Sequence, residues 1–262
     1  MTGGAVLLLC TVHDPEARLL PWIRRLAAPG DPLAARWERV RGNYAHALAA
    51  ASAATDPRSR AGLAAAGWEV IDGADEGSDR GLRALVRRGL TRPEERIHYC
   101  DLDRLVHWLA TFPEELAALP AVWHRADLVM LARSPRAFAT HPPCQTLTEG
   151  PINRLIAARI GVPGADAFSG SYLWSRRAAR AVSEAPGPAD LRFYAEGVLA
   201  PFRAGCTIAR HEVEGLEWET PDQYAAEIAR LGYAAWLEQF QSALQWRRRV
   251  EMASLWIEAV LT

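Results

Sequence analysis

Short apolar runs alternate with segments of helical periodicity over the first 130 residues of the chain. We expect strands at residues 5–10, 44–52, 68–71, 96–100 and 127–132, where apolar side chains follow one another without a polar face. Continuous runs of this kind are typical of strands that are buried on both faces of a parallel sheet. Helical spacing lies between them, as in residues 59–66 and 82–86, while residues 29–43 are expected to form a loop or a partly helical connection. The alternation predicts an α/β fold with a mainly parallel, doubly wound sheet.

The second half of the chain continues the pattern and ends in a helical tail. A proline-rich loop is expected at 134–144, a helix from Thr148 to Ile160, a strand at 168–174, helices at 176–182 and 191–202, and a strand at 206–209 that ends at Arg210. From Pro221 onward, apolar residues keep the spacing of an amphipathic helix. We therefore predict one domain over residues 1–218 and a helical extension over 219–262. The extension is expected to pack on the sheet or on a partner subunit, which would make a homodimer through these helices.

Two carboxylates follow the predicted strand 96–100. Asp101 and Asp103 are spaced i, i+2, which places side chains on one face if the strand continues through them. Like charges at that distance repel each other unless a cation or a proton lies between them. Since ligands of α/β sheets bind where strands lead into helices, one interpretation is a divalent metal that holds a phosphorylated ligand. The alternative is a solvated turn whose carboxylates cap the next helix.

Composition restricts the functional classes. The net charge of −1 gives no electrostatic reason to expect nucleic acid or an acidic membrane surface as a partner. The four cysteines are scattered without a metal-binding spacing, as expected for buried thiols in a reducing compartment such as the cytoplasm. No apolar stretch approaches the ~20 residues that span a bilayer. We therefore expect a soluble cytoplasmic protein without a membrane span.

A loop rich in Gly, Asp and Ser, residues 72–81, opens the helix that contains Arg80 and Arg83. Backbone N–H groups at a helix N-terminus and guanidinium groups can both bind phosphate. The loop lacks the Gly-Lys-Ser/Thr of a Walker motif, so an exposed turn with solvated arginines is the other interpretation.

The order of these motifs resembles the GT-A nucleotide-sugar transferases, in particular the family-two glycosyltransferases that include dolichyl-phosphate mannose synthases and mannosylglycerate synthase. The resemblance covers about residues 5–218 and depends on motif order. The matching segments are the polar turn after the first strand (11–16), the acidic end of the second (Thr55-Asp56), the Gly/Arg helix start (79–84), Asp101-Leu102-Asp103, the Ser-Gly-aromatic segment (168–172) before Arg176-Arg177, and a late histidine, His211. The basic loop with which polyprenyl-phosphate enzymes continue is replaced by His211-Glu212-Val213-Glu214, which favours a small or soluble acceptor.

The resemblance implies a role for each matching residue. It implies a nucleoside-diphosphate sugar as donor, with Mn²⁺ or Mg²⁺ as cofactor. It makes Asp103 a direct metal ligand, His211 another, and Asp101 a contact to the ribose or to metal-bound water. The remaining implied roles are nucleotide binding by Thr11, Asp56, Arg80 and Arg83, acceptor binding by Ser169, Gly170 and Tyr172, and a catalytic carboxylate at Glu196, with Asp190 as second choice.

Two other functions remain open from the sequence. The chain could be an inactive nucleotide-sugar-binding relic of the fold, which would bind a donor without turnover. It could also be a haloacid-dehalogenase-like phosphatase, in which an Asp-x-Asp supplies a nucleophile and an acid. That family carries the motif on its first strand, whereas here it follows about the fourth.

Overall fold

Seven strands form one sheet at the centre of the molecule. The computed structural model describes residues 6–73, 79–185 and 192–262. The strands are β1 (Val6–Val12), β2 (His46–Ala51), β3 (Glu69–Asp72), β4 (Arg96–Cys100), β5 (Leu128–Arg133), β6 (Ser171–Ser175) and β7 (Ile208–Val213). Their order in the sheet is β3-β2-β1-β4-β6-β5-β7. Only β6 runs antiparallel to its neighbours, so the predicted α/β fold with a mainly parallel sheet is confirmed.

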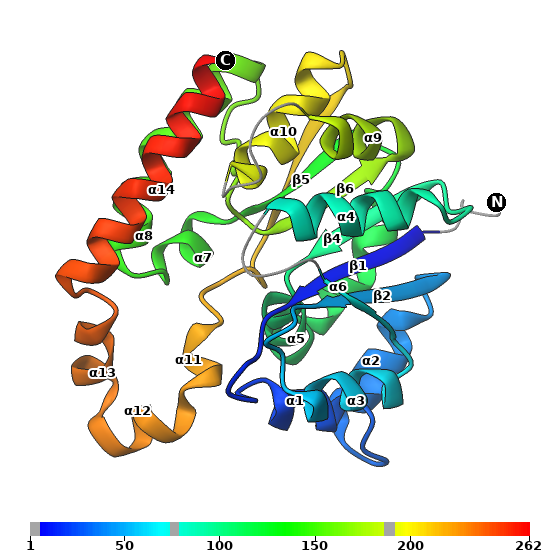
Figure 1. Ribbon diagram of the computed structural model, residues 1–262, viewed down its shortest axis with the longest axis vertical. Helices are drawn as coiled ribbons and strands as arrows, with labels where there is room; N and C mark the ends of the chain where they lie inside the picture. Colours follow the sequence, from blue (N-terminus) through cyan, green and yellow to red (C-terminus); the bar gives the residue numbers. More distant parts are fainter. Residues whose placement is uncertain (1–5, 74–78, 186–191) are drawn as a thin grey trace.

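Helices cover both faces of this sheet. They are α1 (Leu20–Leu26), α2 (Pro32–Arg41), α3 (Pro57–Ala65), α4 (Asp79–Leu90), α5 (Leu102–Thr111), α6 (Pro113–Ala118), the 3-10 turn η1 (Leu119–Ala121), α7 (Pro135–Ala139), α8 (Pro143–Ile160), α9 (Arg176–Glu184), α10 (Phe193–Arg203), α11 (Thr220–Gln223), α12 (Ala225–Leu231), α13 (Tyr233–Gln239) and α14 (Ala243–Leu261). In Figure 1, α4, α9 and α10 lie on one side of the sheet, and α1, α2, α3, α5 and α6 on the other.

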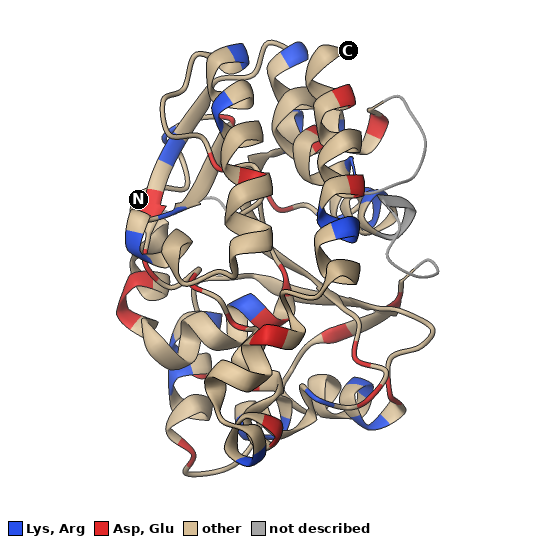
Figure 2. Cartoon of the chain, turned by 90° about the vertical axis from the view of Figure 1, so that its left-hand side faces the viewer, with Lys and Arg blue, Asp and Glu red and all other residues tan. Residues whose placement is uncertain are grey.

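The apolar runs of the sequence are explained by this double cover. In β1, Val6, Leu8 and Cys10 belong to the core on one face of the sheet, whereas Leu7 and Leu9 belong to the core on the other. A strand buried on both faces cannot alternate between apolar and polar residues. Charged residues remain outside, and Figure 2 shows both signs interspersed over the face it presents.

Several element boundaries differ from the prediction. The connection 29–43 contains the helix α2, and the predicted loop 134–144 contains α7 and the start of α8. Helix α8 begins at Pro143 and continues through Pro151, although Thr148-Glu149-Gly150-Pro151 looks like a helix start. The buried carboxylate of Glu149 accepts hydrogen bonds from Arg133 at 2.7 Å and from Arg249 at 3.2 Å. Tertiary pairing thus holds the turn before Pro151 in the helix, which local propensity does not reveal.

The C-terminal helices return to the main body of the chain. Figure 1 shows α14 running alongside α8. The ring of Trp256 stacks on Phe168 with centroids 4.0 Å apart, and Trp256 belongs to the same apolar core as β4 and β6. The tail is therefore attached to the sheet through α8 and α10, and its division from residues 1–218 stays a prediction. Within the described ranges, no helix combines the length and apolar character needed to cross a membrane.

We expect Trp256→Ala to lower the free energy of unfolding by about 3–5 kcal/mol, because it empties a fully packed aromatic site. Trp256 is only 1% exposed. The matched control on the same helix is Val250→Ala, whose side chain is 57% exposed and whose change should stay within about 0.5 kcal/mol. Urea denaturation of both variants measures the difference. Equal effects would mean that α14 is not anchored by its aromatic contact.

Candidate functional site

The site lies where the sheet changes its winding direction. From β1 the chain proceeds outward to β2 and β3, whereas β4 lies on the opposite side of β1. In doubly wound sheets, ligands bind at the carboxyl ends of the two strands that flank such a point. Thr11 lies near the carboxyl end of β1, and Asp101 follows β4 directly. The fold therefore brings these two predicted residues to its expected ligand-binding edge.

Asp101 is fixed by three neighbours. The Thr11 hydroxyl donates to Asp101 Oδ1 at 3.1 Å, and the Tyr99 hydroxyl donates to the same oxygen. Arg104 Nε lies 3.4 Å from Asp101 Oδ2. Asp101 occupies the N-cap position of α5, but its side chain makes no capping hydrogen bond. The helix-capping alternative for this carboxylate is therefore wrong.

Asp103 lies in the first turn of α5 and not, as the i, i+2 argument assumed, on a continuing strand. Its carboxylate accepts from its neighbouring backbone N–H, that of Arg104, at 2.9 Å and from Gln223 Nε2 at 3.1 Å. Burial, followed by the charges of Glu219 and Asp101, raises the pKa of Asp103 to about 7. At neutral pH this carboxyl group therefore exchanges between its protonated and its charged form.

Glu219 is a member of this cluster that the sequence did not reveal. It is 7% exposed, and its Oε2 has no hydrogen-bond partner. Its charge also raises the pKa of Asp101, although burial is the larger cause. Arg104 supplies a buried positive charge beside the three carboxylates. Burial alone would lower the pKa of Arg104, but Glu219 and Asp101 raise it well above its ordinary value.

The segment that follows β7 carries Glu219 to the site. Its backbone N–H groups at Glu214 and Gly215 donate to Glu115 at 2.8 and 2.9 Å. A side chain is excluded at Gly215, since a Cβ atom there would lie 1.7 Å from the Trp108 ring. We refer to residues 214–223 as the strap, because they cross α5 and end at Asp103. A glycine three residues after a strand end was the available sequence signal for this close approach.

His211 lies elsewhere. The predicted strand end at Arg210 is wrong, because β7 pairs with β5 up to Val213 and keeps His211 within the strand, opposite Leu131. The pKa of His211 is lowered, chiefly by burial and then by the charge of Arg125. Among residues 6–73, 79–185 and 192–262, no group of three or more His, Cys, Asp or Glu side chains is arranged to hold a metal ion. The expected set of Asp101, Asp103 and His211 is therefore not assembled.

The predicted nucleotide contacts are dispersed. Asp56 is the N-cap of α3, where it accepts from the Arg58 backbone N–H at 2.7 Å and pairs with the Arg58 guanidinium at 2.9 Å. Arg83 is buried and donates to the carbonyl of Ala185. The side chain of Arg80 and the whole of Asp190 lie outside the described residues. The nucleotide roles of these residues stay predictions.

Of the predicted acceptor residues, Gly170 is in direct contact with the carboxylate cluster. Its φ is +68°, and a Cβ atom would lie 2.6 Å from Asp101 Oδ2 and 2.9 Å from the Arg104 guanidinium. The side chains of Ser169 and Tyr172 are fully buried behind it. The Ser169 hydroxyl donates to the Ser171 carbonyl, and that of Tyr172 donates to the Ala167 carbonyl. The acceptor role of the three residues stays a prediction.

The predicted catalytic carboxylate, Glu196, is 5% exposed in α10 and forms an ion pair with Arg203 of the same helix. Its neighbour Tyr194 was missed by sequence reasoning. The charge of Asp101 and then burial raise the pKa of the Tyr194 phenol, with Asp103 adding to the effect. Helix α10 thus contributes a phenol to the environment of the aspartates. No sequence motif marks this position.

We expect Asp103→Asn to stabilise the metal-free protein at alkaline pH. An acid whose folded pKa is raised binds its proton more tightly in the folded state, so stability falls as pH rises from ~4 towards the folded pKa of about 7. The amide removes this loss. Thermal unfolding with a chelator should therefore show a higher Tm for the variant at pH ~8 and a much smaller difference at pH ~5. A variant that is less stable at pH ~8 would contradict the raised pKa.

The fold is similar to that of solved nucleotide-sugar enzymes. Glucosyl-3-phosphoglycerate synthase from Mycobacterium tuberculosis superposes with a TM-score of 0.50 and 15% identity, over 88% of this chain and 82% of that one. Mannosyl-3-phosphoglycerate synthase from Rubrobacter xylanophilus gives a TM-score of 0.50 and 12% identity, over 88% and 75% of the two chains. A mycobacterial protein gives a TM-score of 0.50 at 16% identity, over 88% of this chain and 75% of that one. No protein-family model and no curated protein sequence matches the chain. The predicted GT-A fold is thereby confirmed.

Proposed function

We propose that the protein is a metal-dependent glycosyltransferase that moves a sugar from a nucleoside-diphosphate sugar to a small, soluble acceptor. One observation carries the proposal. Asp101, Asp103 and Glu219 are crowded out of water at the switch point of a GT-A sheet, with a single adjacent arginine. Such a concentration of negative charge is typical of a site completed by a cation.

The two least satisfied carboxylates fit a divalent metal. Glu219 Oε2 is buried without a partner, and the raised pKa of Asp103 reports a charged form that lacks a counter-ion. Mg²⁺ is commonly bound by one or two carboxylates together with substrate phosphates, so a preformed cage of three side chains is not required. We assign Asp103 and Glu219 as the ligands, with Glu219 in the place expected of His211. When bound, the metal would neutralise the diphosphate leaving group as a Lewis acid.

The donor is assigned to the β1 side of this pair. Thr11 and Tyr99 orient Asp101, and Asp101 in turn faces Arg104. This chain of contacts leaves Asp101 to position its neighbours and to accept from a ribose hydroxyl. Asp56, Arg80 and Arg83 remain candidates for the base and the diphosphate, the last two through guanidinium forks.

The acceptor is assigned to the opposite side, which is basic. The pKa of the His141 imidazole is depressed by burial, then by the charges of Arg133 and Arg104. Arg133 Nη1 and His141 Nε2 are both buried without a hydrogen-bond partner. An acceptor with a carboxylate or phosphate would suit this side, and the two named synthases above act in the formation of sugar derivatives of 3-phosphoglycerate, as their names state. Glu196 is proposed to receive the proton of the acceptor hydroxyl, with Asp190 as the alternative.

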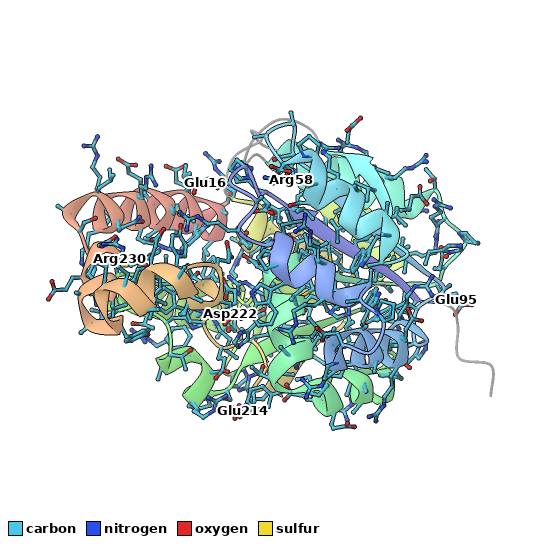
Figure 3. All side chains as sticks on the ribbon, turned by 90° about the horizontal axis from the view of Figure 1, so that it is seen from below. Glu16, Arg58, Glu95, Glu214, Asp222 and Arg230 are labelled. Atoms are coloured by element: carbon cyan, nitrogen blue, oxygen red, sulfur yellow. The ribbon has the colours of Figure 1, made fainter. Side chains whose placement is uncertain are left out.

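A thermal-shift panel tests the donor site. UDP-, GDP- and ADP-sugars are added with and without Mn²⁺ or Mg²⁺ at pH ~8, where Asp103 is charged. A donor at a hundredfold excess over its Kd should stabilise the protein by about 2.7 kcal/mol. We expect a metal-dependent shift that is lost in Asp103→Asn and in Glu219→Gln. The control is Glu95→Gln, an exposed residue at the opposite end of β4 (Figure 3), which should retain the shift.

Product formation separates an enzyme from an inactive binder. With the donor so identified, 3-phosphoglycerate and glycerate are offered as acceptors, and the product is measured by mass spectrometry. Loss of a general base in Glu196→Gln should reduce kcat by about 10²–10⁴-fold while leaving the donor shift intact. Donor binding without product from any acceptor would favour the inactive relic. No metal-dependent shift with any donor would contradict the proposed function.

A further inference from the structure

The strap is fastened to α5 by a histidine that lies outside the carboxylate cluster. His107 Nδ1 lies 2.7 Å from Asp222 Oδ2, and His107 Nε2 lies 3.1 Å from Glu217 Oε1. Its side chain is only 9% exposed. Glu217 and Asp222 stand on either side of Glu219 in the strap, and Gln223 follows directly. A single imidazole therefore holds both ends of the segment that supplies Glu219 and Gln223.

The two contacts require a particular charge state. An ionised carboxylate only accepts hydrogen bonds, whereas a neutral imidazole donates from one nitrogen and presents a lone pair at the other. A neutral His107 could satisfy only one of its two partners and would place a lone pair against the other. The imidazolium donates to both, and charge-assisted hydrogen bonds of this kind are about twice as strong as neutral ones.

We propose that His107 is a positioning residue which, as an imidazolium, holds the strap so that Glu219 and Gln223 face Asp103. The functional consequence rests on the proposed function, since it assigns Glu219 to the metal. His107 itself touches neither donor nor acceptor in this proposal. It acts through the strap alone.

The charged groups around His107 support the double contact. Glu217 and Asp222 approach it from the strap, and Glu217 also accepts from Arg136 of α7 through its other oxygen, at 2.6 Å. Asp103 lies one turn earlier on the same helix. Figure 3 shows Asp222 at the junction between the C-terminal helices and the body of the molecule. Burial lowers the pKa of His107, but its hydrogen bonds to Asp222 and Glu217 outweigh this, and the net direction is upward.

The sign of the pH dependence follows from that direction. A histidine with a raised folded pKa stabilises its contacts fully below the unfolded value of ~6.5, and this contribution is lost as pH rises through the folded pKa. The strap should therefore loosen on the alkaline side. This is opposite to the carboxylates, which gain the charge needed for a cation as pH rises.

Hydrogen exchange of the strap tests the proposal without any substrate. The backbone N–H of Trp218 donates to Thr140 at 2.8 Å and that of Asp222 to the Glu219 carbonyl at 3.0 Å, so both report directly on the strap. In the wild type we expect their protection factors, corrected for intrinsic exchange, to fall about tenfold between pH ~6 and ~9, the size expected for one charge-assisted hydrogen bond. Protection that does not change with pH would overturn the proposal.

Glu217→Gln is the decisive variant. Its amide nitrogen can donate to the lone pair of a neutral His107 while its carbonyl oxygen accepts from Arg136, so both contacts survive deprotonation. We expect its protection factors to stay level across the same pH range. His107→Gln should lose protection already at pH ~6, and His124→Gln, an exposed histidine outside the strap, should behave as the wild type. A fall in Glu217→Gln equal to that of the wild type would overturn the proposal.

The metal then connects the strap to the proposed function. At alkaline pH the wild type should need about tenfold more Mn²⁺ for half-maximal donor shift than Glu217→Gln, because only the wild type loses a strap contact. If no donor shift occurs with any variant, the proposed function fails while the exchange data still decide the role of His107. If the exchange behaves as expected but the metal requirement of the two proteins is equal, the strap does not position Glu219, and this inference is overturned.

Discussion

Negative charge gathered at the carboxyl end of the central strands is the constraint on which the rest of the structure depends. Three carboxylates withdrawn from water would repel one another strongly in a medium of low dielectric constant. The chain offsets part of this repulsion with hydroxyl donors from Thr11 and Tyr99 and with the guanidinium of Arg104. It leaves Asp103 and Glu219 without full compensation. The protein thus maintains a local electrostatic strain that a cation would relieve.

Secondary structure distributes the members of this cluster over distant parts of the sequence. The strands β1 and β4 supply Thr11, Tyr99 and Asp101, the first turn of α5 supplies Asp103, and the strap supplies Glu219. The strap in turn depends on α5 and α6, since Glu115 accepts from its backbone and the Trp108 indole donates to the same carboxylate at 2.7 Å. The elements that carry the cluster therefore also hold it in place. Such mutual support is characteristic of sites that are preorganised for charge.

The C-terminal helices are part of this arrangement. Arg249 of α14 donates to Glu149 and to Gln145 of α8, at 3.2 and 3.1 Å. Glu149 also accepts from Arg133, which extends a buried ionic network from the tail to the carboxyl end of β5. Removal of one partner from such a network leaves an uncompensated buried charge, which costs more than a surface ion pair contributes. Residues 219–262 thus contribute to both the core and the site, whatever their separate folding would be.

The sequence by itself determined the fold class and the central edge of the site. Continuous apolar runs required strands buried on both faces, and the order of motifs placed Thr11, Asp101 and Asp103 at the switch point, because carboxyl ends of parallel strands meet at one edge. It did not determine which residue completes the cluster. His211 looked suitable because local pattern ended β7 at Arg210, whereas pairing with β5 extends the strand to Val213 and postpones the turn. Glu219, Tyr194 and His107 gain their significance only from contacts across many residues of sequence. Tertiary structure alone decided these, since burial and charge at each position are set by neighbours that local sequence does not specify.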